Sequence, residues 1–186
     1  KPVKGTAQGD GFAVPFDKAD EIVSPGYYEV TIMDGALNVK LTASSRVAYH
    51  RYIRNSVEVN DNLGLILDLK SSARSLLFRQ GIQDFTFSQL DDHTVAGFRK
   101  SDEWARDHKV YFAARFNHPV LSVSGDGPVY NLNFGDQDYV DARVSVSYSS
   151  IEGAVANLDA EKEISFDDAL AHAVAQWSKE LSKIEF

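Results

Sequence analysis

Residues 27–54, YYEVTIMDGALNVKLTASSRVAYHRYIR, contain three short runs in which apolar and polar residues alternate. Alternation with a period of two is typical of a strand with one buried face, because successive side chains point to opposite faces of a sheet. The run 37–41 follows this pattern without interruption. The Asp34-Gly35 pair before it is a strong signal for a two-residue hairpin turn. The stretch therefore predicts consecutive antiparallel strands.

The third run is unusual because it carries Arg46, His50 and Arg51 among apolar and aromatic residues. Alternation puts Arg51 on one face with Tyr49, and Arg46 and His50 on the other face. One interpretation is structural, with the arginines bridging strands or binding loop carbonyls. The other interpretation is that these side chains belong to a functional site.

The rest of the chain extends the strand pattern. Further strands are predicted at 63–69, 83–88, 94–99, 109–116, 129–134 and 141–148, separated by turns rich in Gly, Asp, Asn and Pro. In the last of them, Val144, Val146 and Tyr148 are expected to point inward, and Arg143, Ser145 and Ser147 outward. About nine strands without interleaved helices predict a mainly β fold, an antiparallel β-sandwich.

The chain changes character after residue 150. A short helix is expected in the run SIEGAVANLDAE and a longer one after Ser165, which can cap it with Asp168 in the capping-box position. The longer helix has an apolar stripe at helical spacing, made of Phe166, Leu170, Ala173, Val174, Trp177, Leu181 and Ile184. Either the sandwich covers this stripe, or the helix leads into a further, helical domain.

Composition restricts the class of protein. Of the 186 residues, 44% are hydrophobic and 25% charged, as is ordinary for a soluble domain. The net charge of −8 argues against nucleic acid as a partner, since phosphate binding needs a basic surface. The longest apolar runs are too short to span a membrane. There is no cysteine, so disulfides and thiolate metal sites are excluded. The first residues lack a Met and a signal peptide, as expected either for a processed mature end or for a piece cut from a longer chain.

The search for catalytic and metal-binding patterns finds none. The five histidines are scattered without the spacing of a metal site, and the acidic residues do not single out a glycosidase pair. The loops 124–128 and 134–138 contain Asp and Gly and could bind calcium, although hairpin turns explain them better. Trp104 lies in a polar loop, where an exposed ring could stack on a sugar, or it could belong to the core. The residues themselves therefore single out no catalytic pair and no metal site.

Five pieces of the sequence, in order, resemble the amino-terminal domain of glycoside hydrolase family 92, the calcium-dependent α-mannosidases. They are SPGYYEV, LTASSRVAYHRYI, VYFAARFNHPV, VSVSYSSIEGAVANL and FDDALAHAVAQWSKELSKI. The resemblance implies a β-sandwich like that of galactose mutarotase, joined through helices to an (α/α)6 catalytic barrel. It divides the chain into an extended lead-in at 1–24, the sandwich at 25–150, and a helical segment at 151–186 that leads towards the catalytic domain.

The resemblance also carries functional expectations. In the family, the general acid, the general base and most calcium contacts belong to the barrel, so this chain is expected to be the non-catalytic part of a secreted or periplasmic, exo-acting α-mannosidase. The partners implied are the helical domain of the same polypeptide and a mannose-containing glycan, with calcium in the full-length enzyme. Residues expected to face substrate or an interface are Arg46, His50, Arg51 and Trp104, and those expected on the interdomain helix are Trp177 and Leu181. A free-standing carbohydrate-binding or protein-interaction sandwich is the alternative.

Overall fold

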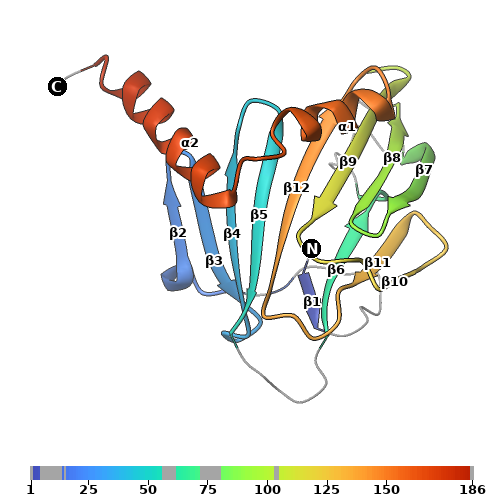
Figure 1. Cartoon of the computed structure of the whole chain (residues 1–186), viewed down its shortest axis with the longest axis horizontal. Coiled ribbons are helices and arrows are strands. Elements are labelled where there is room, and N and C mark those ends of the chain that lie inside the picture. The colour runs from blue at the N-terminus through green and yellow to red at the C-terminus, as the bar shows by residue number, and fades with distance from the viewer. Residues whose placement is uncertain are drawn as a thin grey trace.

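The computed structural model describes residues 2–4, 14, 16–55, 62–71, 81–102 and 105–184. The described strands form two antiparallel sheets that pack face to face, which confirms the predicted sandwich (Figure 1). The larger sheet has the order β2 (Glu21–Ser24), β3 (Tyr27–Ile32), β4 (Leu37–Ala43), β5 (Val47–Arg54), β12 (Tyr139–Ser147), β9 (His108–Phe116), β8 (Thr94–Ser101) and β7 (Ile82–Asp91). The smaller sheet has the order β1 (Pro2–Lys4), β6 (Leu63–Asp68), β11 (Val129–Asn133) and β10 (Ser122–Ser124).

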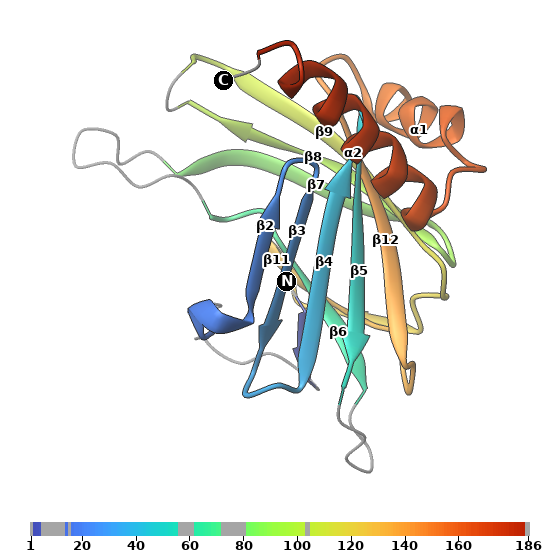
Figure 2. The same ribbon diagram turned by 90° about the vertical axis from the view of Figure 1, so that its left-hand side faces the viewer.

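Two hydrophobic cores lie on opposite faces of the larger sheet. The first fills the space between the sheets and includes Leu37, Val39, Tyr52, Leu132 and Phe134. The second lies under the helices α1 (Ile151–Ala160) and α2 (Phe166–Leu181), which cover the other face. In Figure 2, α2 crosses β4 and β5, the two strands with which it makes most of its contacts. The larger sheet is therefore the middle layer of three.

The β3–β4 hairpin forms at the predicted place, but its loop has four residues instead of two. Ile32 pairs with Leu37, and Met33, Asp34 and Gly35 all have positive φ values of 55°, 52° and 89°. Left-handed backbone of this kind favours Gly, and Asp tolerates it. The Asp-Gly signal therefore located the hairpin correctly and underestimated the length of its loop.

Three short strands were not predicted. β1 and β2 come from the segment 1–24, and β10 follows Leu121; each has only three or four residues. So few residues cannot show an alternating pattern, and these strands gain their stability from pairing with β6, β3 and β11. A 3-10 turn at Lys18–Asp20 precedes β2.

The end of β12 differs from the sequence prediction. Val144 packs against the core between the sheets, but Val146 and Tyr148 are exposed. Ser145, predicted to point outward to solvent, is buried, and its hydroxyl donates a hydrogen bond to the carbonyl oxygen of Ala154 at 2.6 Å. The reason is that α1 covers the polar face of this strand. Among the described residues, no helix is long and apolar enough to cross a membrane.

Candidate functional site

The three basic residues singled out in the sequence at 46–51 lie in three different environments. Arg46 is exposed in the turn before β5. Arg51 points to the face covered by the helices, and His50 points to the space between the sheets. The alternation along β5 was therefore predicted correctly, and it separates the residues that looked like one cluster. Trp104 lies outside the described residues.

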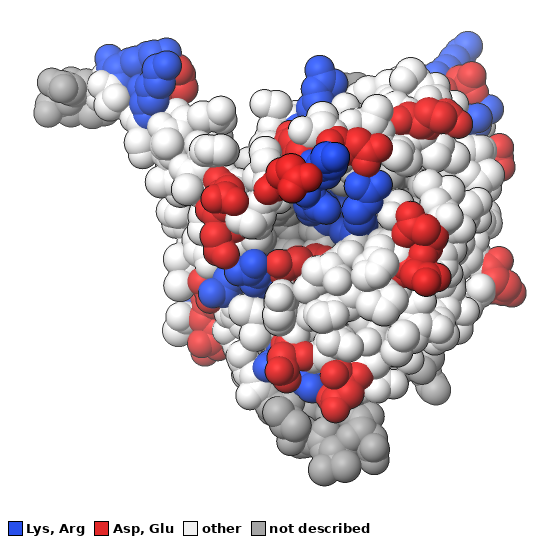
Figure 3. Space-filling view, viewed as in Figure 1, with Lys and Arg blue, Asp and Glu red and all other residues white. Residues whose placement is uncertain are grey.

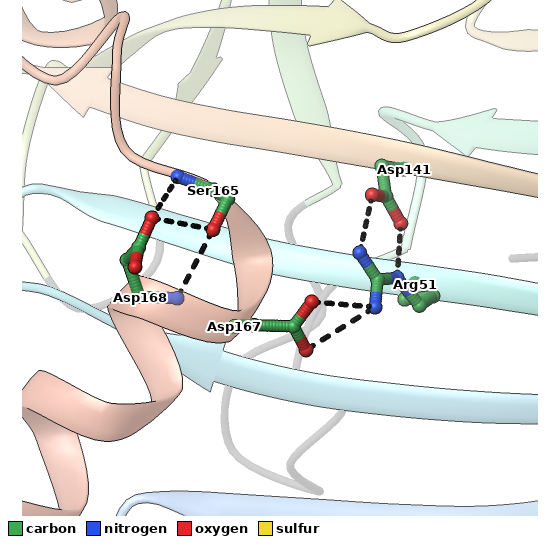
Figure 4. Close-up of polar contacts among 5 residues, drawn as sticks. All are labelled: Arg51, Asp141, Ser165, Asp167 and Asp168. Carbon is green, nitrogen blue, oxygen red and sulfur yellow. Dashed lines mark hydrogen bonds and ion pairs between the residues drawn. The ribbon is translucent and has the colours of Figure 1, made fainter.

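Arg51 connects two strands and a helix (Figure 4). Its Nε and Nη2 donate to the two carboxylate oxygens of Asp141 in β12, at 2.7 and 2.9 Å. Its Nη1 lies 3.3 Å from both carboxylate oxygens of Asp167 in the first turn of α2. The guanidinium also lies over the ring of Phe166, 4.7 Å from its centre. The hydrogen bonds to Asp141 raise the pKa of Arg51 above its usual value.

A second group of contacts holds the connection between the two helices on the same face. Arg143 in β12 donates to the carbonyl oxygens of Glu161 and Lys162, at 3.1 and 2.8 Å. The carboxylate of Glu161 accepts hydrogen bonds from Tyr49 at 2.7 Å and from Ser44 at 2.8 Å. Side chains of β5, β12 and the turn after β4 thus fix the place where α1 ends and the chain turns towards α2.

The charged side chains of this region are mixed in sign. Figure 3 shows Lys and Arg interspersed with Asp and Glu around a hollow on the face of the molecule seen in Figure 1, and the described residues of that face form no continuous basic stripe. Arg115 in β9 and Asp159 in α1 form one such pair, at 2.8 Å. The pattern fits ion pairs that join helices to the sheet better than a surface for a polyanion.

α2 is anchored at its beginning and exposed at its end. The predicted capping box is present, with Ser165 Oγ accepting from the backbone N–H of Asp168 and the Asp168 carboxylate accepting from the backbone N–H of Ser165. Phe166, Ala169 and Ala173 are buried. Leu170 packs against the same core, and the stripe is open to solvent from Val174 on, with exposed fractions of 51% for Trp177 and 55% for Leu181. Figure 1 shows this part of α2 extending beyond the sheet.

Gly26 is a residue of this site that the sequence did not identify. It has a positive φ of 82°, and a Cβ atom placed on it would lie 3.1 Å from the backbone carbon of Ala173 and 3.1 Å from Cδ1 of Trp177. Only glycine adopts this backbone conformation without strain and, having no Cβ atom, leaves room for a helix at this distance. The Pro25-Gly26 turn is thus the point where α2 rests on the edge of the sheet. Nothing local in the sequence could show that a helix packs against this turn.

His50 faces a cavity of about 420 Å³ between the sheets. Its Nδ1 lies 2.8 Å from the hydroxyl of Tyr52, and burial lowers the pKa of His50 to about 4. The imidazole is therefore neutral at pH 7. Arg99 in β8 lines the same cavity, and no feature of the sequence distinguished it from the other arginines.

The carboxylates of one loop that could bind calcium lie beside an arginine. Among the described residues, there is no group of three or more His, Asp or Glu side chains that could hold a metal ion. In the loop 134–138, the carboxylates of Asp136 and Asp138 lie 2.6 and 3.6 Å from Nη2 of Arg54. These carboxylates face a guanidinium instead of converging on a cation, so this loop does not fit the calcium interpretation.

Comparison with known proteins gives a consistent result. A family model described as "Glycosyl hydrolase family 92 N-terminal domain" matches residues 1–166. A family GH92 α-mannosidase from Bacteroides thetaiotaomicron has a similar structure, with a TM-score of 0.81 and 19% identity over 98% of this chain. The family GH92 inverting mannosidase of Bacteroides thetaiotaomicron VPI-5482 gives a TM-score of 0.75 and 20% identity over 99% of this chain.

A third solved structure, the GH92 family glycosyl hydrolase ccman5, gives a TM-score of 0.72 and 22% identity over 91% of this chain. The present chain covers 28%, 26% and 25% of these three chains, so it spans about a quarter of their length. No curated protein matches the sequence.

Proposed function

Because the chain belongs to glycosyl hydrolase family 92, through the N-terminal domain of that family, we propose that it is the non-catalytic β-sandwich of an exo-acting α-mannosidase. In this proposal, the full-length protein hydrolyses mannose-containing glycans, and the acid and base of the reaction belong to a helical domain of the same polypeptide. The sandwich supports that domain and holds it in position through α2.

The observation that carries the proposal is the exposed half of the apolar stripe on α2. Val174, Trp177, Leu181 and Ile184 are all exposed, although they continue the line of the buried Phe166 and Ala173. Apolar side chains aligned on one helix face gain free energy when a partner covers them, about 25 cal/mol for each Å² removed from water. The helical domain of the same polypeptide is the partner that the family membership favours.

The contacts of Arg51 and Gly26 support this role. They fix the first half of α2 against the sheet, so the exposed half leaves the sandwich in a defined direction. A helix held in this way can position a neighbouring domain with less loss of conformational entropy than a flexible linker. In this proposal, Arg51 acts on the interface indirectly, by fixing α2, and makes no contact with the sugar.

The proposal leaves calcium and the sugar to the helical domain. The carboxylates of Asp136 and Asp138 lie beside Arg54, and we expect calcium in the full-length enzyme to be held outside this chain. The family resemblance supports export from the cytoplasm, to the periplasm or the outside of the cell, as the setting in which glycans of this kind are met.

The experiment uses the longer polypeptide that carries both the sandwich and the helical domain. The double substitution Trp177→Ser and Leu181→Ser is expected to reduce turnover of an aryl α-mannoside at least tenfold and to lower the melting temperature. The same substitutions in the 186-residue chain should lower its melting temperature much less, because Leu181 is exposed there and only about half of the Trp177 side chain is covered. The control is Ala171→Ser with Gln176→Ser, two exposed positions outside the stripe.

Equal activity and equal melting temperature for the stripe variant and the control would overturn the proposed role of α2. Calorimetry of the 186-residue chain with methyl α-mannoside tests the alternative of a free-standing sugar-binding module. Saturable binding of the mannoside to this chain would favour that alternative, and the proposal predicts that none is observed.

A further inference from the structure

The cavity between the two sheets lies on the face of the larger sheet opposite to α2, and the proposed function does not use it. Its volume of about 420 Å³ falls in the range of small-molecule sites, which is roughly 300–1,000 Å³. Strands β5, β8, β9 and β12 form one wall, and β6 and β11 form the other. Most of the lining is apolar, with Leu65, Leu67, Val95, Phe112, Leu132 and Val144 as examples.

Arg99 carries a positive charge in this lining. No described residue of the cavity carries a negative charge that could pair with it. Its Nε and Nη2 atoms are buried and have no hydrogen-bond partner among the described residues. The described residues that line the cavity include no Asp or Glu. The other polar side chains of the lining do not supply an anion either: His50 lies against the hydroxyl of Tyr52, and Ser101 and His108 carry no negative charge. Buried N–H donors of a charged group are normally paired, since desolvation without a partner is unfavourable.

These two donor atoms define the kind of anion that fits. Nε and Nη2 form one edge of the guanidinium, and two parallel N–H bonds from such an edge match the two oxygens of a carboxylate. The Arg51–Asp141 pair elsewhere in this sheet uses the same two atoms in this way. The apolar lining selects the remainder of the ligand, because leucine, valine and phenylalanine side chains accept an alkyl chain and offer no partners to hydroxyl groups.

We propose that this cavity binds a free, medium-chain alkyl carboxylate, with the alkyl chain along the apolar lining between the sheets. The Arg99 side chain turns on binding, so that the carboxylate reaches its Nε and Nη2, which are buried in the present structure. A mannose residue is a poorer occupant, since several of its hydroxyl groups would be buried without hydrogen bonds. The residues that line the site include none from the α2 stripe.

Titration calorimetry of the purified chain with sodium decanoate, below the concentration at which it forms micelles, tests the proposal. Decan-1-ol serves as the uncharged ligand of equal length and decylamine as the cationic one. We expect decanoate to bind at one site per chain, at least tenfold more tightly than decan-1-ol, with no saturable binding of decylamine.

Arg99→Met is the decisive variant, and Arg106→Met, at an exposed arginine, is its matched control. Arg99→Met removes a buried charge and keeps most of the side-chain volume, so it is expected to fold. It should abolish the preference for decanoate over decan-1-ol, whereas Arg106→Met should retain it. Should Arg99→Met fail to fold, Val144→Phe, which fills part of the cavity, should weaken binding of both ligands at least tenfold.

Three results would overturn the proposal. The first is the absence of saturable decanoate binding to the unmodified chain. The second is equal affinity for decanoate and decan-1-ol, or an unchanged preference in Arg99→Met. The third is binding of methyl α-mannoside that decanoate displaces, which would identify the cavity as a sugar site.

Discussion

Arg51 in β5 and Asp141 in β12 lie directly opposite each other in neighbouring strands, and the guanidinium of the first donates two hydrogen bonds to the carboxylate of the second. The same guanidinium reaches Asp167 at the start of α2. The junction of the two central strands of the larger sheet therefore also fixes the helix that leaves the sandwich.

Replacement of Arg51 tests this junction. Arg51→Met should lower the free energy of unfolding by about 2–3 kcal/mol, because the partly buried carboxylate of Asp141 loses its charged partner. Asp167→Asn, at a side chain that is mostly exposed, should lower it by less than about 1 kcal/mol. Urea unfolding measures both values. Similar small changes for the two variants would show that the Arg51–Asp141 pair does not stabilise the fold.

Gly26 provides a test of the position of α2. Gly26→Ala should destabilise the chain by about 2–3 kcal/mol, because the new methyl group meets the backbone of Ala173 and the ring of Trp177 in addition to the strain of a positive φ. Gly35→Ala is a matched control, since Gly35 also has a positive φ, of 89°, but a methyl group there would meet no atom of the described residues within 4 Å. It should lose only about 1 kcal/mol. Equal losses in chemical denaturation would contradict the close approach of α2 to Gly26.

His50 gives the stability a specific pH dependence. Its pKa is about 4 in the folded chain, against 6.5 for an unperturbed histidine. Between these values the unfolded chain binds a proton that the folded chain does not bind, so stability is fully present above pH 6.5 and is lost as the pH falls to 4. The loss attributable to His50 is at most about 3 kcal/mol.

The variant His50→Gln should therefore lose less stability than the unmodified chain between pH 6.5 and pH 4, as measured by urea unfolding at several pH values. His172→Gln, at an exposed position in α2, is the control and should follow the unmodified chain. Carboxylates whose pKa is lowered in the folded chain, such as Glu29 beside Tyr27, contribute equally in all three proteins, and comparison of the curves removes their contribution. Parallel curves for His50→Gln and the unmodified chain would refute the assignment.

Local pattern accounts for most of the fold that could be predicted from the sequence. Alternation in 37–41 and the capping box at Ser165 depend on residues close together in the chain, and both are present in the structure. The pairing of β5 with β12 joins Arg51 to a residue 90 positions away, and nothing local encodes that distance. For the same reason, Arg46, His50 and Arg51 looked like a cluster, although the sheet and its two covering layers separate them.

The candidate sites were less predictable than the fold. The apolar stripe of α2 was visible as a helical period, but its exposure depends on where the sheet ends. Arg99 became informative only through its surroundings, since the lack of a partner for its buried Nε and Nη2 among the described residues is a property of the three-dimensional structure. Ser145 shows the same limit, because its burial results from a helix that follows it in the chain.

The central claim is that the chemistry of glycan hydrolysis belongs to a domain outside this chain. Its most direct test is the rate of hydrolysis of an aryl α-mannoside by the purified 186-residue chain, with calcium supplied. The account predicts a rate equal to that of buffer alone. Turnover that is lost when one of the chain's own carboxylates, such as Asp141 or Glu161, is replaced by its amide in a variant that still folds would contradict the account.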